Sequence, residues 1–379
     1  MKSSQLTRRV SKVLGILLLC ALSFGTGLWT NSRLKSADER LIDLAYRNIT
    51  RDSLFSQQST REISYAAIRG MLDVIEDPYA ELIEPTAAQN FTSTFSGQTG
   101  VVGLYAEKID QHVVISIVFP NGSADLAGLR VGDVILAIDG VTLDQDTDSS
   151  EAGLMIRGAP GTNVNLKILR DGQELDFELT RQPREFVSYR MLPEGIGYIT
   201  LTAFNRTASE QMKAGLTALL ALKPAGLIWD LRNNEGGDMQ AAQEILSYFI
   251  QDGLLFTADM THDRTYRFEA SGEILAADIP LVVLMDQTTY SAAETCAAAV
   301  AETGRGKTIG STSYGKGVIQ ATIPLLDNTL LQMTVARWRA PGGEWYHERG
   351  VPPQIEAYDD PATSTDELID QATAILMSQ

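Results

Sequence analysis

The spacing of apolar residues predicts two helices near the start of the main part of the chain, within a helical segment of residues 31–90. The apolar positions at helical spacing are Leu41, Ala45 and Ile49 for the first helix, and Ile63, Ala67, Met71 and Val74 for the second. Ser59 and Glu62 have the spacing of a capping box at the start of the second helix, and the sequence Asp77-Pro78-Tyr79 ends it. The segment is too short to bury a large core alone, so we expect it to pack on another domain or on a second copy of the chain.

From residue 91 to residue 183 the pattern changes to strands. Apolar residues alternate with polar ones at 164–168 and again at 175–179, and the dipeptide Asp171-Gly172 lies between these two runs. Alternation on both sides of an Asp-Gly pair is typical of a β-hairpin. This region is therefore predicted to be a separate β-domain.

Residues 184–357 alternate between short apolar strands and helices. The predicted strands are 196–201, 226–231 and 281–285, with helices at 209–222 and 239–250. Such alternation indicates an α/β domain with a partly parallel sheet. Residues 358–379 form an acidic tail, in which 363–377 have the pattern of a final amphipathic helix.

The N-terminus has the pattern of a membrane signal. Residues 1–12 are basic, and residues 13–30 carry no charge and are rich in Leu and Ile. Eighteen residues rise about 27 Å as a helix, which is close to the thickness of a hydrocarbon core. A signal anchor with the rest of the chain on the extracytoplasmic side is the preferred interpretation; the alternative is a signal peptide cleaved near residues 25–27, which would release a secreted protein.

Charge and cysteine content narrow the classes of partner. The formal net charge is −17, although the first 37 residues contain six basic residues and no acidic ones. The rest of the chain is therefore strongly acidic, which argues against nucleic acid as a partner. Of the two cysteines, only Cys296 lies beyond the N-terminal signal, so no disulfide forms within this part of the chain.

Five sequence motifs occur in an order that resembles a known family. The chain contains "DPYA" at 77–80, "SADLAGLRVGDVILAIDG" at 123–140, "WDLRNNEGG" at 229–237, "YSAAE" at 290–294 and "SYGKGVIQ" at 313–320. The second run resembles a PDZ domain. Together the motifs resemble the C-terminal processing peptidases, also called tail-specific proteases. The resemblance spans roughly residues 38–357 and implies a crotonase- or Clp-protease-like α/β peptidase core with an inserted PDZ domain.

The resemblance also implies roles for particular residues. Ser291 matches the family nucleophile, Lys316 its general base and Gln320 the residue that orients the lysine. The backbone N–H groups of Gly237 and Ala292 match the oxyanion hole. No metal or cofactor is implied. Departures from the family pattern, at Glu235, Ala293 and Ala80, concern the substrate groove more than the Ser-Lys pair.

The PDZ resemblance implies a site for the ends of peptides. PDZ domains add an extended peptide to a sheet edge and hold its terminal carboxylate with backbone N–H groups. The carboxylate loop is expected at Gly100, Val101, Val102, Gly103 and Leu104. The alternative interpretation of these residues is a glycine bend with no ligand.

Elementary chemistry is consistent with a Ser-Lys pair. A serine hydroxyl needs a base, and a lysine acts as one only when uncharged, which requires lowering its pKa by about three units from about 10.4. Burial away from carboxylates achieves this. Ser291 precedes a predicted helix at 292–303, whose dipole favours negative charge at that end.

Alternative interpretations exist for several of these residues. Ser291 with Glu294 is also a capping box, and Lys316 between two glycines is often a solvated loop residue. The run 310–317 nearly matches a phosphate-binding loop, but Gly317 lacks the hydroxyl that Mg²⁺ requires there. Cys296 is interpreted as a small buried residue, and Arg157 either reports peptide occupancy to the catalytic domain or is a plain surface arginine. The three histidines, His112, His262 and His347, have no metal-site spacing and are interpreted as structural or surface residues.

The sequence thus predicts a membrane-tethered serine endopeptidase that recognises the C-terminal tails of proteins through its PDZ domain and cleaves through an acyl-enzyme. The alternative is a membrane-anchored PDZ adaptor whose peptidase domain is inactive. The helical segment also predicts self-association into a homo-oligomer.

Overall fold

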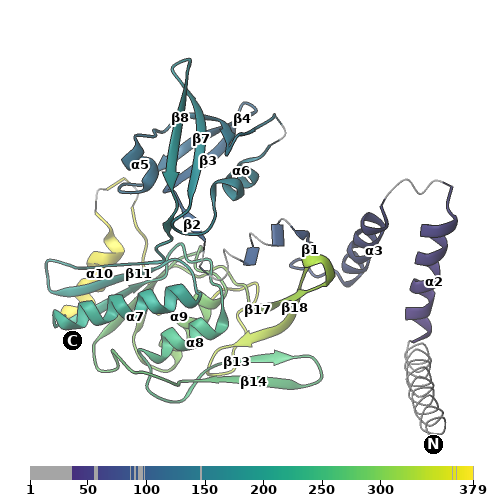
Figure 1. Ribbon diagram of the computed structural model, residues 1–379. Coiled ribbons are helices and arrows are strands. Elements are labelled where there is room, and N and C mark those ends of the chain that lie inside the picture. Colours follow the sequence, from purple (N-terminus) through teal and green to yellow (C-terminus); the bar gives the residue numbers. More distant parts are fainter. Residues whose placement is uncertain are drawn as a thin grey trace, which may run out of the picture. The chain divides into compact units, whose positions relative to one another are not determined.

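The structure is a computed structural model that describes residues 36–54, 59–85, 87–88, 91–92, 97, 99–145, 147–360, 362–363 and 365–378. Contacts between residues divide the chain into two units, 1–76 and 77–379. Figure 1 shows the elements of each unit.

The first unit contains two capped helices, α2 (Ala37–Asp52) and α3 (Thr60–Ile75). Each begins with a capping box, Ser36 with Glu39 and Ser59 with Glu62, as the sequence predicts for α3. Many of their large apolar side chains are exposed: Leu41, Ile42, Leu44, Ile49, Met71, Val74 and Ile75. The predicted membrane span 13–30 lies outside the described residues, and no helix among the described residues is long and apolar enough to cross a membrane.

A β-domain occupies the first part of the second unit. Its main sheet has the order β3-β4-β5-β7-β8, with β6 beside β5, and a separate pair joins β2 to β9. The elements are β2 (Gly100–Val101), β3 (Leu104–Ile109), β4 (His112–Val118), α5 (Ser123–Ala127), β5 (Val134–Ile138), β6 (Val141–Thr142), α6 (Ser149–Ile156), β7 (Asn163–Arg170), β8 (Gln173–Thr180) and β9 (Gln182–Pro183). The predicted hairpin is β7–β8, in which Asp171 and Gly172 both have positive φ between paired strands.

The α/β domain that follows contains a mostly parallel sheet of order β10-β11-β12-β15-β16-β19. Its strands are β10 (Val187–Met191), β11 (Ile196–Leu201), β12 (Gly226–Asp230), β15 (Leu281–Met285), β16 (Lys307–Gly310) and β19 (Ile355–Glu356). Only β10 runs antiparallel to its neighbour. The predicted partly parallel α/β sheet is therefore present, and its central strands are buried on both faces, as such sheets require.

Helices cover both faces of this sheet. Leu227, Trp229 and Val283 share one core with α7 (Arg206–Ala221), α8 (Met239–Ser247) and α9 (Ala292–Glu302). The alternate strand residues, such as Ile228 and Leu284, pack with α10 (Glu367–Met377) on the other face. The amphipathic helix predicted at 363–377 is thus part of the folded core of the domain, because its apolar side completes the second layer.

A second sheet places the segment that precedes the β-domain beside the end of the α/β domain. It consists of β1 (Glu81–Ile83), β13 (Leu254–Met260), β14 (Arg264–Glu269), β17 (Val318–Pro324) and β18 (Leu330–Arg339). The strand order in this sheet is β1-β18-β13-β14, and β17 also pairs with β18. A short 3-10 turn at Leu326–Asn328 joins β17 to β18. Because β1 pairs with β18, the β-domain is an insertion within the fold that contains both sheets of the α/β domain.

Candidate active site

Ser291 lies in a strained turn between β15 and α9. Its φ is 56° and its ψ is −116°, a conformation that non-glycine residues rarely adopt. The residue is the N-cap of α9, so its side chain lies at the positive end of the helix dipole. The sequence prediction of a helix beginning after Ser291 is confirmed by the bounds of α9.

Lys316 lies in the loop between β16 and β17, and its side chain is half-buried. Its Nζ lies 4.8 Å from the ring centroid of Tyr79 and 4.8 Å from that of Tyr290. Burial lowers the pKa of Lys316, while the negative charges of Glu294 and Asp77 act in the opposite direction. The net lowering increases the fraction of neutral amine, which is the form that can accept a proton.

The two residues are connected through Glu294, whose side chain is fully buried. Its Oε2 accepts hydrogen bonds from the backbone N–H of Ser291 at 2.7 Å and from that of Lys316 at 2.8 Å. Its Oε1 accepts from the hydroxyl of Ser313 at 2.5 Å and from the N–H of Gly315 at 2.6 Å. Burial raises the pKa of Glu294, although these hydrogen bonds act to lower it. One carboxylate therefore fixes the backbones of Ser291 and Lys316 relative to each other.

The side-chain heads of Ser291 and Lys316 are not directly bonded. Among the described residues, no hydrogen bond joins the Ser291 hydroxyl to the Lys316 amine, and the amine forms no ion pair. Tyr290, which is adjacent to Ser291 in sequence, provides the aromatic contact to the amine. Catalytic hydrogen bonds are commonly long or absent without substrate, so this arrangement is compatible with a general base that engages on substrate binding.

Gln320 is on β17, near Lys316 in sequence but bonded elsewhere. Its Nε2 donates to the hydroxyl of Thr334 at 3.4 Å, and that hydroxyl donates in turn to Asp77 at 3.0 Å. The N–H of Thr334 also donates to Asp77 at 2.7 Å. Burial alone would raise the pKa of Asp77, but these hydrogen bonds and one from Tyr79 lower it. Gln320 is thus linked to the "DPYA" segment, whose Tyr79 contacts the lysine.

The glycine pair after β12 lies against Ser291. A Cβ built on Gly236 would be 2.8 Å from the Cβ of Ser291 and 2.9 Å from the backbone N of Ala292, so only glycine fits. The N–H of Gly236 donates a hydrogen bond to Oδ1 of the Asn234 side chain. Within the described residues, the N–H groups of Gly237 and Ala292 have no acceptor, and both remain available for an oxyanion.

A cavity of about 810 Å³ includes Tyr290, the residue before Ser291, in its lining. Residues from three loops line it: Glu235, Gln287, Thr288, Tyr290, Ser313 and Tyr314. The rings of Tyr290 and Tyr314 meet edge to face, with centroids 4.7 Å apart. The cavity was not predicted from the sequence, because its walls come from segments that are distant along the chain.

In the β-domain, the predicted carboxylate loop lies between β2 and β3. Gly103 has a positive φ and packs against Gly122, where a Cβ would approach to 2.8 Å. Neither Val102 nor Gly103 donates its N–H to an acceptor in the part of the chain that the structure describes. Gly100 and Val101 pair with β9, and Leu104 begins β3. This loop therefore presents free N–H groups, which is what binding of a peptide carboxylate requires.

Other residues considered from the sequence lie outside this arrangement. Cys296 is completely buried on α9, and burial raises its pKa well above the ordinary value, so its thiol is poorly suited to act as a nucleophile. Burial lowers the pKa of Arg157, with a further contribution from Arg184. His347 is structural, because its Nδ1 accepts the N–H of Gly317 at 3.2 Å. The described residues contain no group of three or more His, Cys, Asp or Glu side chains arranged to hold a metal ion.

Comparison with protein families identifies two regions of the chain. The model of peptidase family S41 matches residues 195–357, and a PDZ domain model matches residues 100–180. The first range contains Ser291 and Lys316, and the second covers the β-domain from β2 to β8.

Curated proteins match over most of the chain. A carboxyl-terminal-processing protease of Synechocystis sp. is 33% identical over 325 residues, which is 82% of this chain and 75% of the relative. The carboxy-terminal processing protease CtpB of Bacillus subtilis is 29% identical over 346 residues, covering 86% of this chain and 68% of the relative. Among solved structures, the photosystem II D1 C-terminal processing protease is 26% identical with a TM-score of 0.53, covering 90% of this chain and 98% of that protein.

Proposed function

This chain belongs to the carboxyl-terminal processing proteases, serine peptidases of family S41 with a PDZ domain, and we propose from this how it selects and cleaves its substrates. In our proposal, Ser291 and Lys316 form the catalytic dyad of an endopeptidase. The observation that carries it is the buried Glu294 carboxylate, which binds the backbone N–H groups of both residues.

The proposed reaction follows from the chemistry of these groups. The neutral amine of Lys316 takes the proton of the Ser291 hydroxyl while Oγ attacks the peptide carbonyl. The N–H groups of Gly237 and Ala292 stabilise the oxyanion of the tetrahedral intermediate, assisted by the dipole of α9. The ammonium of Lys316 then protonates the leaving amine, and water hydrolyses the acyl-enzyme in a second cycle. The lowered pKa of Lys316 favours the first step.

Substrate choice is proposed to depend on the PDZ domain. An extended C-terminal tail would add as a strand to β3, and its carboxylate would bind the free N–H groups of Val102 and Gly103. The partners are therefore proteins or peptides with exposed C-termini. Gly100, Val101 and Leu104 would complete the loop.

Location and assembly are proposed from the N-terminal sequence. The uncharged residues 13–30 after a basic segment support a single membrane anchor with the catalytic domain on the extracytoplasmic side, and cleavage of the same segment would instead secrete the protein. The exposed apolar side chains of α2 and α3 support self-association of the chain. Sedimentation of residues 38–379 as a monomer at micromolar concentration would contradict self-association.

The dyad is tested by Ser291→Ala and Lys316→Ala, assayed on a gel with a substrate that carries an exposed C-terminal tail. Each change should reduce cleavage by about 10³-fold or more, because nucleophile and base act as a unit. Lys316→Arg is the matched control for charge and size: arginine stays protonated, so it too should be inactive. Unchanged cleavage in any of the three variants would contradict the dyad.

The adaptor alternative has one observation in its favour, the absence of a hydrogen bond between the Ser291 hydroxyl and the Lys316 amine in the described structure. A serine-reactive probe separates the two functions. Labelling of the wild type but not of Ser291→Ala supports the peptidase. Tight peptide binding with no labelling under any condition supports the adaptor.

A further inference from the structure

The cavity lined by Tyr290 combines an aromatic wall with one carboxylate. Tyr290 and Tyr314 provide an aromatic wall, and the ring of Tyr314 is largely exposed, at 58%. Glu235 is the only charged residue among those that line the cavity, and its side chain is exposed. The remaining lining residues are neutral and polar.

The position of the cavity associates it with the reacting bond. Tyr290 immediately precedes Ser291, and the hydroxyl of Ser313 donates to Glu294, the carboxylate that also holds the N–H of Ser291. Glu235 precedes the glycine pair of which Gly236 lies against Ser291. A substrate residue next to the scissile bond therefore has this cavity within reach of its side chain.

The carboxylate of Glu235 is available to a ligand. Among the described residues the Glu235 carboxylate forms no ion pair, although it interacts electrostatically with Arg157. Burial raises the pKa of Tyr290 to about 12, and the charge of Glu235 contributes to this shift, so the phenol stays neutral at ordinary pH. A formal net charge of −17 on the whole chain adds a field that attracts basic peptides.

We propose that this cavity is a substrate subsite for a lysine or arginine side chain next to the scissile bond, selected by Glu235. This inference depends on the proposed peptidase function. The aliphatic stem and the guanidinium or ammonium head pack on the rings of Tyr290 and Tyr314, while the head group pairs with Glu235.

The test uses peptides that share one C-terminal tail and differ at a single position near the cleavage site. Each position is occupied in turn by arginine or by citrulline, which has nearly the same shape but no charge. At one position the wild type should cleave the arginine peptide about 10-fold faster in kcat/KM, which corresponds to about 1.4 kcal/mol, because only arginine carries a charge that can pair with Glu235. In Glu235→Gln the arginine-to-citrulline ratio at that position should fall to about one.

Glu194→Gln is the matched control, because Glu194 is an exposed glutamate in the turn before β11, at the opposite end of the parallel strands. It removes the same charge and should retain the wild-type ratio. The subsite is refuted if no position favours arginine, if the ratio survives in Glu235→Gln, or if Glu194→Gln loses it equally. The peptidase function is judged separately, by whether Ser291→Ala and Lys316→Ala lose cleavage of these peptides irrespective of the residue at the varied position.

Discussion

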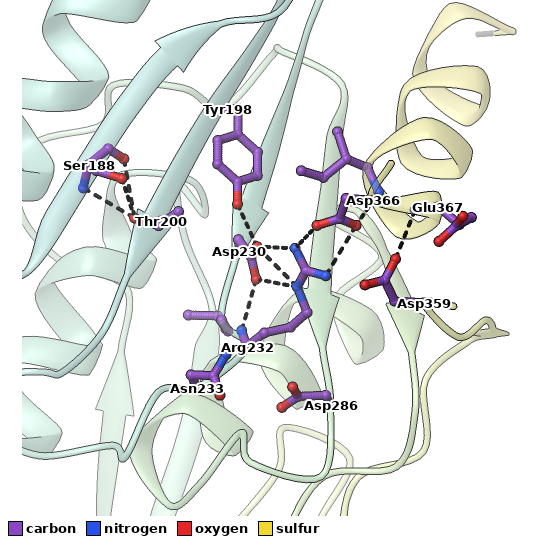
Figure 2. Close-up of polar contacts among 12 residues, drawn as sticks. Ser188, Tyr198, Thr200, Asp230, Arg232, Asn233, Asp286, Asp359, Asp366 and Glu367 are labelled. Carbon is purple, nitrogen blue, oxygen red and sulfur yellow. Dashed lines mark hydrogen bonds and ion pairs between the residues drawn. The ribbon is translucent and has the colours of Figure 1, made fainter. Parts of the chain in front are cut away.

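Two buried carboxylates of the catalytic domain, Glu294 and Asp230, are satisfied in different ways. Asp230, at the end of β12, accepts hydrogen bonds from the guanidinium of Arg232 and from the hydroxyl of Tyr198, and Arg232 also pairs with Asp366 at the start of α10 (Figure 2). Glu294 accepts hydrogen bonds only from neutral backbone N–H groups and one hydroxyl.

The two environments have opposite electrostatic consequences. Burial alone would lower the pKa of Arg232, but its hydrogen bonds to Asp230 and Asp366 raise it well above the ordinary value, as expected of a stabilising pair. Burial raises the pKa of Glu294, so its charged form is unfavourable in the fold. Asp230 therefore serves to stabilise the domain, whereas Glu294 holds the backbones of Ser291 and Lys316 in place at some cost in stability.

The largest expected effect is on catalysis, from Glu294→Gln. The amide can accept hydrogen bonds on one side only, so either the pair Ser291 and Lys316 or the pair Ser313 and Gly315 loses its acceptor. We expect kcat/KM to fall by about 100-fold or more, because small displacements of catalytic groups have effects of this size. The assay is peptide cleavage by protein shown to be folded by circular dichroism; activity within threefold of the wild type would show that the carboxylate does not position the dyad.

The next effect is on stability, from Asp230→Asn. This change leaves Arg232 with weaker compensation in a largely buried position, so the free energy of unfolding should fall by about 3 kcal/mol. Cleavage by the folded fraction should remain within about threefold of the wild type. Urea unfolding and peptide assays measure the two quantities. If Asp230→Asn unfolds like the wild type but loses activity, Asp230 would act on activity rather than on stability, contrary to the role assigned to it.

Tyr198→Phe sharpens the comparison with a smaller change in the same cluster. It removes only the hydroxyl that donates to Asp230 at 2.7 Å. The free energy of unfolding should fall by about 1 kcal/mol, because Asp230 keeps its ion pair. The same urea experiment checks this, and a loss as large as that of Asp230→Asn would show that the phenol, not the guanidinium, dominates.

The smallest effect concerns pH dependence. In the wild type, kcat/KM should rise with pH as Lys316 loses its proton, with a midpoint below the ordinary lysine value of 10.5, because burial lowers its pKa. The charge of Asp77 acts against this lowering, so Asp77→Asn should move the acid limb to lower pH by less than about one unit. A pH profile measures the shift. Movement toward higher pH would contradict the assigned sign.

The sequence predicted the elements of the site better than their connections. The strand, turn and helix around Ser291 follow from local patterns, and the capping pair of Ser291 and Glu294 is visible at a spacing of three residues. The bonds from Glu294 to Gly315 and Lys316 depend on how a distant loop closes, and no local pattern encodes that closure. Gln320, which the resemblance expects to orient the lysine, donates to Thr334 where β17 and β18 pair, and its role toward Lys316 stays a prediction.

The pairing of β1 with β18 has a practical consequence for preparing the enzyme. The region that matches the peptidase family begins at residue 195, yet Asp77 and Tyr79, which contact Thr334 and Lys316, lie before the PDZ insertion. A recombinant fragment cut to the family boundary would lack Asp77 and Tyr79, and with them these contacts to Thr334 and Lys316. A minimal active enzyme must therefore begin before Asp77. The PDZ domain can be deleted only if a linker connects the end of β1 to the start of β10.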